Sequence, residues 1–255
     1  MISRMLMMAA AYAGGSPPVG SGQAIFGYGS TNIDVSMTNL VSNTGIVSGD
    51  VTGVGTARWL LAAASYGTDK AIFGYGYSTI HVSMKNLVSN SGVVSNDVTG
   101  VGTARYQLAA ASYGTDKAIF GYGNALFAVS MTNLVSNSGV VSNDVTGVGT
   151  ARWELAAASY GTDKAIFGYG DTGTILSLTN LVSNIGVVSS DVSGIGTARY
   201  GLAASSYGND KAIFGHGIDG SSYVSLTNLV SNTGVVSGDV TGVGTARYGL
   251  AAASF

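Results

Sequence analysis

The side chains of this chain that are able to carry out chemistry divide into those that recur along the sequence and those that do not. Arginine and aspartate recur at nearly fixed spacing. The arginines are Arg58, Arg105, Arg152, Arg199 and Arg247, and one set of aspartates is Asp50, Asp97, Asp144, Asp191 and Asp239. A catalytic acid and base need environments that set their pKa values apart, whereas equivalent carboxylates share one environment. The recurring charges are therefore predicted to join parts of the fold through charge-assisted hydrogen bonds.

The side chains that do not recur give little indication of an enzyme. A glycosidase needs two unlike carboxylates beside one site, but the acidic residues that do not recur are scattered along the chain. They are Asp34, Glu154, Asp171 and Asp219. The two histidines, His81 and His216, stand at non-equivalent places without a third ligand at metal spacing. No Gly-x-Gly precedes a predicted helix, as a phosphate loop requires, so we expect no enzymatic activity, no cofactor and no metal.

Composition excludes the partners that charge would attract. Charged residues make up 9% of the chain and the formal net charge is -2, so neither nucleic acid binding nor membrane insertion is expected. The absence of cysteine excludes disulfides, thiolate metal sites and cysteine nucleophiles. With 39 glycines and only 2 prolines, the chain is predicted to be rich in turns.

A repeat of 47 residues is predicted to position these side chains. Phe26, Phe73, Phe120, Phe167 and Phe214 are each 47 residues apart, and the segments that begin at Lys70 and Lys117 differ at only eight of 47 positions. No window shows a sustained 3.6-residue apolar period, so each repeat is predicted to form four short strands. In one repeat these are residues 61–66, 70–75, 82–88 and 93–98. Four strands and this period fit a propeller blade better than a solenoid coil.

The strand count predicts how the two ends of the chain meet. The second, third and fourth strands occur five times from Gln23 onward, and the chain ends after an unpartnered first strand at residues 248–255. Pairing this last strand with the N-terminal set completes five blades and leaves little exposed sheet edge. We therefore expect an all-β fold. We expect it to be a five-bladed β-propeller of four-stranded blades over residues 23–255, in which the C-terminal strand closes the ring by completing the N-terminal blade.

The residue order within each repeat resembles that of a kelch repeat. Thr-Ala-Arg ending at Arg58 precedes a strand of small apolar residues, and Gly-Thr-Asp at residues 67–69 leads into Lys-Ala-Ile-Phe-Gly-Tyr-Gly at residues 70–76. Two departures are the tyrosine between the glycines and the place of Trp59 and Trp153, which follow the arginine. The resemblance covers residues 23–255 and implies a β-propeller. The Gly, Ala, Ser and Thr-rich copies are also similar to repeats of virion proteins from tailed marine phages, which implies a place in a virion.

Differences between the near-identical copies gather in two places. Residues 77–81 differ throughout from residues 124–128, and residues 106–107 differ from residues 153–154. In an up-and-down blade both places lie at one end, where scaffold loops commonly bind partners. Unconstrained drift is the alternative, but drift favours small polar residues, and aromatic rings are common in recognition. The predicted binding residues are Trp59, Tyr77, His81, Gln107, Phe127, Trp153, Glu154 and Tyr223.

Residues 1–22 lie outside the repeat and allow three interpretations. Residues 11–13 superficially satisfy a secretory cleavage site, after which the mature chain would start at Gly14. Residues 4–12 also resemble residues 58–66 and would then be a decayed first strand. We favour an arm that docks onto a neighbouring subunit. Its apolar cluster is Met5, Leu6, Met7 and Met8.

Together these features predict a non-enzymatic binding or assembly module. The virion is the expected location, as a tail attachment or head-surface protein whose partners are other virion subunits, a cell-surface receptor or a glycan. The alternatives are a secreted, lectin-like adhesin that binds glycans and, from another class, a glycan-active enzyme.

Overall fold

The structure, a computed structural model, describes residues 9–10 and 23–254, and these residues form strands and no helix. The predicted all-β fold is confirmed. Five antiparallel sheets of three strands follow one another along the chain. They are β1 (Ala9–Ala10), β2 (Ala24–Ser30) and β3 (Asp34–Val41); β4 (Ala62–Tyr66), β5 (Lys70–Gly74) and β6 (Lys85–Val88); β7 (Ala109–Tyr113), β8 (Lys117–Gly121) and β9 (Thr132–Val135); β10 (Ala156–Tyr160), β11 (Lys164–Gly168) and β12 (Thr179–Val182); β13 (Ala203–Tyr207), β14 (Lys211–Gly215) and β15 (Thr227–Val230).

Each of the last four sheets begins with a strand of small residues that joins the next strand through a three-residue turn. In the second sheet, β4 pairs with β5 from Ala62 opposite Gly74 to Tyr66 opposite Lys70. Gly67 and Thr68 of the turn have φ values of 60° and 70°, a left-handed conformation that suits glycine. The predicted first and second strands are thus confirmed to within one residue at each end.

The predicted fourth strand of each repeat does not form a continuous strand. In the second repeat, residues 93–98 bridge β6 at only two places. Between those places the Leu87 amide donates to Ser95 Oγ over 2.9 Å, and Asn86 Nδ2 donates to the Ser95 carbonyl over 3.0 Å. Side-chain groups thus replace part of the backbone ladder. The predicted four-stranded blade is a three-stranded sheet with a hydrogen-bonded outer segment.

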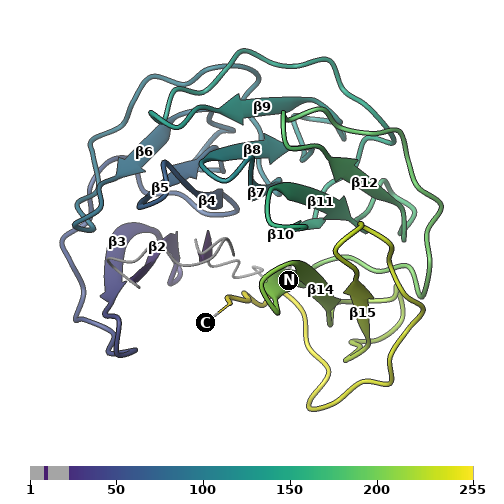
Figure 1. The fold of residues 1–255 in the computed structure, drawn as a ribbon. Helices are drawn as coiled ribbons and strands as arrows, with labels where there is room; N and C mark the ends of the chain where they lie inside the picture. Colours follow the sequence, from purple (N-terminus) through teal and green to yellow (C-terminus); the bar gives the residue numbers. More distant parts are fainter. Residues whose placement is uncertain (1–8, 11–22, 255) are drawn as a thin grey trace.

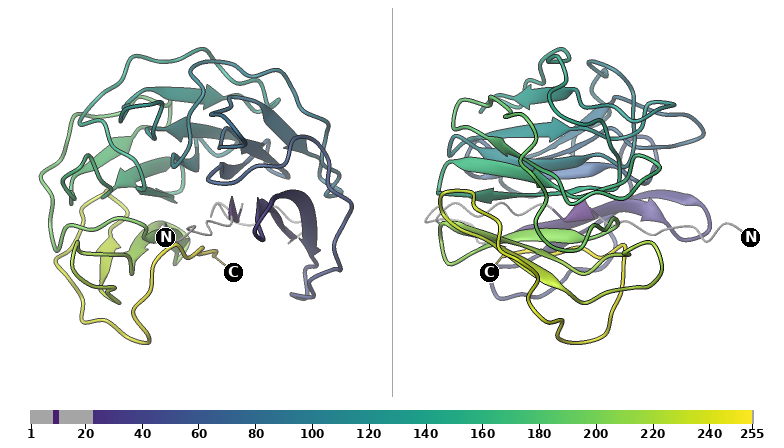
Figure 2. Two further views of the ribbon diagram at one scale, coloured as in Figure 1. Left: turned by 180° about the vertical axis from the view of Figure 1, so that it is seen from behind. Right: turned by 90° about the vertical axis from the view of Figure 1, so that its right-hand side faces the viewer.

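The sheets are arranged in chain order around a centre, with the first strand of each sheet innermost (Figure 1). Seen from behind, the same order runs from β2 and β3 round to β14 and β15, with the C-terminus between the first and last sheets (Figure 2). An axial cavity of about 50 Å³ lies at the centre and is lined mainly by alanine and serine. Ala252 from the C-terminal segment also lines the axial cavity. Small residues are required here because five elements converge on one narrow space.

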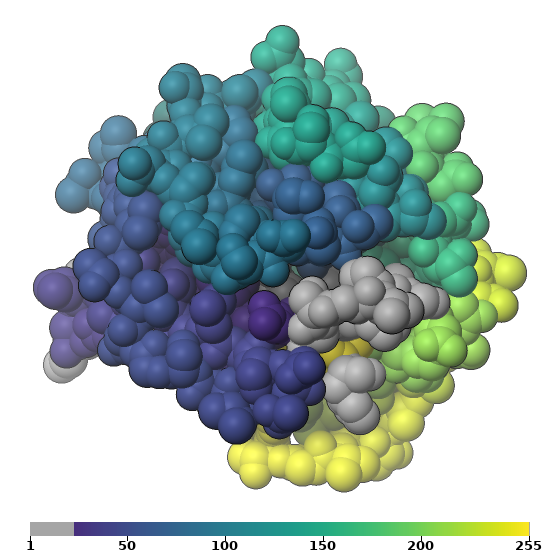
Figure 3. All heavy atoms as spheres, turned by 60° about the vertical axis from the view of Figure 1, so that its left-hand side comes forward, coloured from purple at the N-terminus to yellow at the C-terminus, as the bar shows by residue number. Residues whose placement is uncertain are grey.

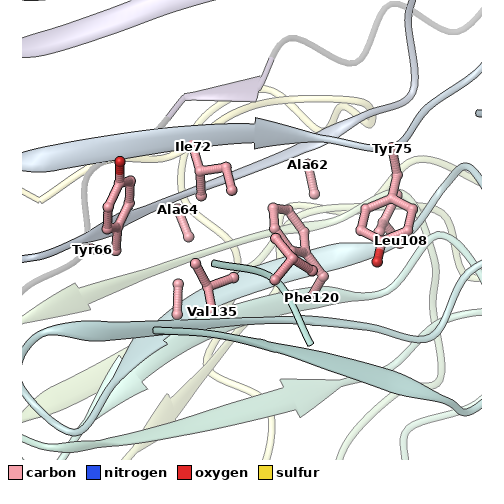
Figure 4. Close-up of a cluster of buried hydrophobic side chains, with 10 residues drawn as sticks. Ala62, Ala64, Tyr66, Ile72, Tyr75, Leu108, Phe120 and Val135 are labelled. Carbon is pink, nitrogen blue, oxygen red and sulfur yellow. The ribbon is translucent and has the colours of Figure 1, made fainter. Parts of the chain in front are cut away.

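Neighbouring sheets pack through a recurring contact between a tyrosine, a phenylalanine and a glycine. Between the second and third sheets, the rings of Tyr75 and Phe120 meet edge to face at a centroid distance of 5.2 Å. A Cβ on Gly74 would lie 2.7 Å from the Phe120 ring, so only glycine lets the ring approach this backbone. Figure 4 shows these rings with Ile72, Leu108 and the alanines of β4 in one buried cluster. The same ring pair recurs between the first and second sheets and at the next two interfaces.

A buried arginine completes each of these four interfaces. Arg105 stacks on Tyr75 of the preceding sheet at 4.2 Å from guanidinium carbon to ring centroid. Its Nε donates to the Tyr122 carbonyl over 2.8 Å, its Nη2 donates to Asn133 Oδ1 over 2.6 Å, and Asp144 lies 3.9 Å from Nη1. Arg58, Arg152 and Arg199 have equivalent stacking contacts and are fully buried. This network agrees with the structural role predicted for the recurring charges.

The fifth interface, between the last sheet and the first, is not formed. Phe26 is half-buried whereas its four equivalents are fully buried, and a Cβ on Gly215 would meet only the Thr227 methyl group, at 3.4 Å. Arg247 is exposed and donates to the Thr245 carbonyl over 3.0 Å. Among the described residues no arginine contacts Asn39, the equivalent of Asn133.

The first sheet also corrects the prediction that the C-terminal strand completes the N-terminal blade. β1 pairs with β2 in the register Ala9 opposite Gly27 and Ala10 opposite Phe26, which is the register of β4 on β5. Residues 250–254 form no strand. The physical reason is that the chain carries two alanine runs, at residues 9–11 and 251–253. Both runs suit the small-residue inner position, and the structure places Ala9 and Ala10 there.

The predicted arm over residues 1–22 lies largely outside the described residues. This holds for its apolar cluster, Met5, Leu6, Met7 and Met8, so the docking role of the arm stays a prediction.

Candidate binding face

The two variable places of the sequence lie together at one end of the sheets. The residue that follows each buried arginine forms a backbone bridge with a residue of the connection between the second and third strands. Trp59 pairs with Tyr77 through two hydrogen bonds of 2.9 and 2.8 Å. Equivalent bridges join Tyr106 to Asn124, Trp153 to Asp171 and Tyr200 to Ile218. Of the eight differences between the repeats at Lys70 and Lys117, seven therefore lie at this end, and the eighth, Lys85, is buried in β6.

Aromatic rings from two repeats form one cluster on this end. Tyr77 contacts Trp59 at a centroid distance of 6.3 Å, Tyr106 at 5.6 Å and His81 at 5.7 Å, and His81 lies 4.8 Å from Tyr106. Near the C-terminal end of the chain, Tyr223 stacks on Tyr248 at 5.0 Å with an interplanar angle of 10°. We call this surface the aromatic face. Its residues are Trp59, Tyr77, His81, Tyr106, Trp153, Tyr200, Tyr223 and Tyr248.

The structure distributes the predicted binding residues unevenly over this face. Trp59, Tyr77 and His81 contact one another, while Gln107 hydrogen-bonds Glu154 beside Trp153. Phe127 is 80% exposed at the tip of its loop and has no ring contact among the described residues. The prediction missed Tyr106, Tyr200, Tyr248 and Asp171. An aromatic residue follows every recurring arginine, and this signal identifies the three tyrosines.

An open series of four backbone hydrogen bonds runs beneath the aromatic face from sheet to sheet. The amide of Gln107 donates to the Leu60 carbonyl, that of Glu154 to Gln107, that of Gly201 to Glu154 and that of Gly249 to Gly201, over 2.8 to 3.0 Å. All five residues have positive φ, from 52° to 64°. This conformation is natural for glycine and costs about 1 kcal/mol for Leu60, Gln107 and Glu154. We call these five residues the backbone ring.

Glu154, next to Trp153 of the aromatic face, is an acid whose pKa is strongly raised. Its side chain is only 7% exposed, and Gln107 Nε2 donates to Oε1. Among the described residues, Oε2 has no hydrogen-bond partner. Burial and then the nearby charge of Asp171 raise the pKa of Glu154 to about 7, although the hydrogen bond from Gln107 lowers it. The buried carboxyl is therefore close to half-ionised at neutral pH.

Comparison with known proteins adds no relative. No known family and no curated protein matches the chain. Residues 9–10 and 23–254 contain no group of three or more histidine, cysteine or acidic residues that could hold a metal. In the same part of the chain, no helix is long and apolar enough to span a membrane.

Proposed function

We propose that the chain is a non-enzymatic binding module that contacts its partner through the aromatic face. One observation carries this proposal: the places where near-identical repeats differ meet in space and hold a cluster of aromatic rings. Tyrosine and tryptophan supply large contact areas at a low cost in side-chain entropy. A scaffold that is identical from repeat to repeat, with one variable end, suits recognition better than catalysis by equivalent groups.

We further propose that the scaffold is a closed five-bladed β-propeller. Most groups of the four observed interfaces have equivalents on both sides of the unformed one, namely Gly215 and Arg247 on the last sheet and Phe26, Asn39 and Asp50 on the first, while His216 stands in the place of the tyrosine. Gly217 donates to the Arg247 carbonyl over 3.0 Å, as Gly76 does to Arg105 over 2.9 Å. The C-terminal segment therefore leaves the last sheet along the same path that precedes β7. In the space-filling view, the purple and blue atoms of the first repeat lie at the left and the green and yellow atoms of the last repeat at the lower right (Figure 3).

The first test replaces the loop that contributes most to the ring cluster. Exchanging residues 77–81 for serine and glycine should leave the melting temperature within about 2 °C, because none of these residues is buried in the core. Attachment to target cells should fall strongly, as measured with fluorescently labelled protein. Val140→Ser is the matched control, since Val140 is 65% exposed and follows a turn that contacts the opposite end of the sheets. If attachment is unchanged after all five such loops are replaced, the aromatic face is not the contact.

The location proposed for this module is a virion, in which it would attach the particle to a receptor or glycan, or to other virion subunits. We expect mass spectrometry of purified particles to detect the N-terminal peptide that begins at Met1. A mature chain that begins at Gly14 and is recovered from the culture medium would instead identify a secreted adhesin.

A glycan-active enzyme is the second candidate, because the structure brings together two of the four scattered acids. Asp171 pairs with Trp153, next to Glu154, and burial raises the pKa of Glu154 to about 7. Two carboxyls in unlike environments are what general acid catalysis of glycoside hydrolysis needs. A hydrolytic activity of the purified chain that Glu154→Gln abolishes would place the protein in this class.

A further inference from the structure

One carboxylate oxygen of the aromatic face lacks a partner although it is buried. Glu154 is 93% buried, as its 7% exposure shows, and Oε2 accepts no hydrogen bond in the structure. Buried polar atoms are nearly always paired, and an unpaired one costs about 1 to 3 kcal/mol, or more when it is charged. The other oxygen, Oε1, is held by Gln107, which fixes the direction of the carboxyl group.

The backbone ring does not require a carboxylate at this position. The equivalent residues are Leu60, Gln107, Gly201 and Gly249, which all have positive φ, and Gln107 and Gly201 form the same pair of backbone hydrogen bonds as Glu154. Glycine would satisfy that conformation without strain and without burying a charge. A role in the fold therefore does not account for Glu154.

The surroundings of Glu154 are acidic and aromatic and contain no compensating cation. Asp171 pairs with Trp153 through backbone hydrogen bonds of 3.0 and 2.9 Å and thus lies beside Glu154. Within residues 23–254, no salt bridge reaches either acid. Arg152, although close in sequence, directs its nitrogens at Tyr169, Thr150 and Asn180.

Tyr106 and Tyr200 lie near Glu154, because each of them precedes a residue of the backbone ring. Tyr106 precedes Gln107, whose side chain holds Glu154, and Tyr200 precedes Gly201, whose amide donates to the Glu154 carbonyl. Burial and then the charges of Tyr77 and Glu154 raise the pKa of Tyr106. Burial and then the charges of Glu154, Asp171 and the nearby tyrosines raise that of Tyr200. The charge of the Glu154 carboxyl thus contributes to the raised pKa of both tyrosines.

We propose that Glu154, together with Asp171, Tyr106 and Tyr200, binds the primary ammonium group of a ligand. An ammonium N–H donates to the unpartnered Oε2, the positive charge compensates the two carboxylates, and the tyrosine rings add cation–π attraction. A quaternary ammonium lacks the N–H donor, and a neutral sugar lacks the charge. The inference rests on the proposed binding role of the aromatic face and specifies its ligand. The ammonium belongs either to an amino sugar or to a lysine side chain.

The test is isothermal titration calorimetry of the full chain with n-butylammonium, which carries the lysine-like group. At pH 8.5 we expect saturable binding that Glu154→Gln weakens by about tenfold or more, because the variant removes the carboxylate charge that attracts the ammonium group. The variant places at position 154 the residue that the preceding repeat has at position 107. Asp219→Asn is the matched control, since it removes the same charge from a loop at the same end of the sheets, and it should bind like the wild type.

A proton count separates a ligand role for Glu154 from a merely structural one. Because its pKa is about 7, binding at pH 6 should release close to one proton per ammonium bound, and binding at pH 8.5 close to none. Titrations in buffers of different ionisation enthalpy measure this number. Glu154→Gln should release no proton at either pH.

Further probes identify the source of the ammonium and the outcomes that overturn the proposal. Tighter binding of glucosamine than of n-butylammonium indicates an amino sugar, and the reverse order indicates a lysine side chain. The proposal is wrong if neither amine binds, if tetramethylammonium or N-acetylglucosamine binds equally well, or if Glu154→Gln has no effect. None of these outcomes refutes a binding role for the aromatic face, which the exchange of residues 77–81 tests separately.

Discussion

Replacing Arg105 with methionine should lower the free energy of unfolding by about 3 kcal/mol or more. Arg105 is fully buried between two sheets, where it stacks on Tyr75, donates to Asn133 and lies near Asp144. Removing one partner from a buried charged network typically costs about 3 to 5 kcal/mol, because the remaining polar groups lose their hydrogen bonds. Methionine preserves most of the apolar stem, so the loss reports on the guanidinium. Urea unfolding followed by circular dichroism measures it.

Arg247→Met is the comparison that decides whether the ring closes. In a closed five-bladed propeller, Arg247 is the arginine of the fifth interface, opposite Asn39 and Asp50, and its loss should approach that of Arg105→Met. If the fifth interface stays unformed, Arg247 is a surface residue with one hydrogen bond. Its replacement should then change stability by no more than about 0.5 kcal/mol. The second result would refute the proposed closure without affecting the four observed interfaces.

Glu154→Gln should make the protein more stable at alkaline pH, by up to about 3 kcal/mol, and leave its stability unchanged in acid. The pKa of Glu154 rises from an ordinary value of 4.5 to about 7 on folding, so the folded state favours the protonated acid. This contribution is fully present below pH 4.5 and is lost as pH rises through 7. Glutamine mimics the protonated form at every pH and still accepts the hydrogen bond from Gln107.

The measurement is the difference in unfolding free energy between variant and wild type from pH 4 to pH 9. Asp97, Asp144 and other aspartates with lowered pKa values change stability in both proteins equally, so the difference isolates residue 154. We expect it to be near zero at pH 4, to rise between pH 4.5 and pH 7 and to be constant above. A difference independent of pH would show that the carboxyl titrates alike in the folded and unfolded states.

The repeat made the arrangement of the sheets predictable, because a fixed period multiplies one local pattern. In the second repeat the first two strands follow from alternating small and large residues on either side of a Gly-Thr-Asp turn, and they were predicted to within one residue at each end. The outermost strand was wrong because Ser95 and Asn86 use side-chain atoms where a ladder would use the backbone. The periodicity of hydrophobic residues does not indicate where side-chain atoms take the place of backbone hydrogen bonds.

The candidate site was less predictable because it depends on contacts between repeats. The joint position of residues 77–81 and residues 106–107 followed from the order of strands in a blade, and the bridges agree with it. The pairing of Gln107 with Glu154 and the proximity of Asp171 did not follow. They depend on how neighbouring sheets are placed relative to one another, and the sequence of a single repeat does not specify that placement. The role of Ala9–Ala10 was missed for a related reason: two alanine runs suited one position equally well.

The near-identity of the sheets has a consequence for folding fidelity. β4, β7 and β10 share the sequence AAASY, and β5, β8 and β11 share KAIFG, with the same register in each pair. An inner strand thus forms the same hydrogen bonds with a second strand from the wrong repeat, or from another molecule, as with its own. The native pairing is favoured because the three-residue turn costs less loop-closure entropy than a longer connection and closes faster. At high protein concentration, where strands from another chain compete with that turn, refolding yields exchanged molecules whose individual sheets are indistinguishable from native ones.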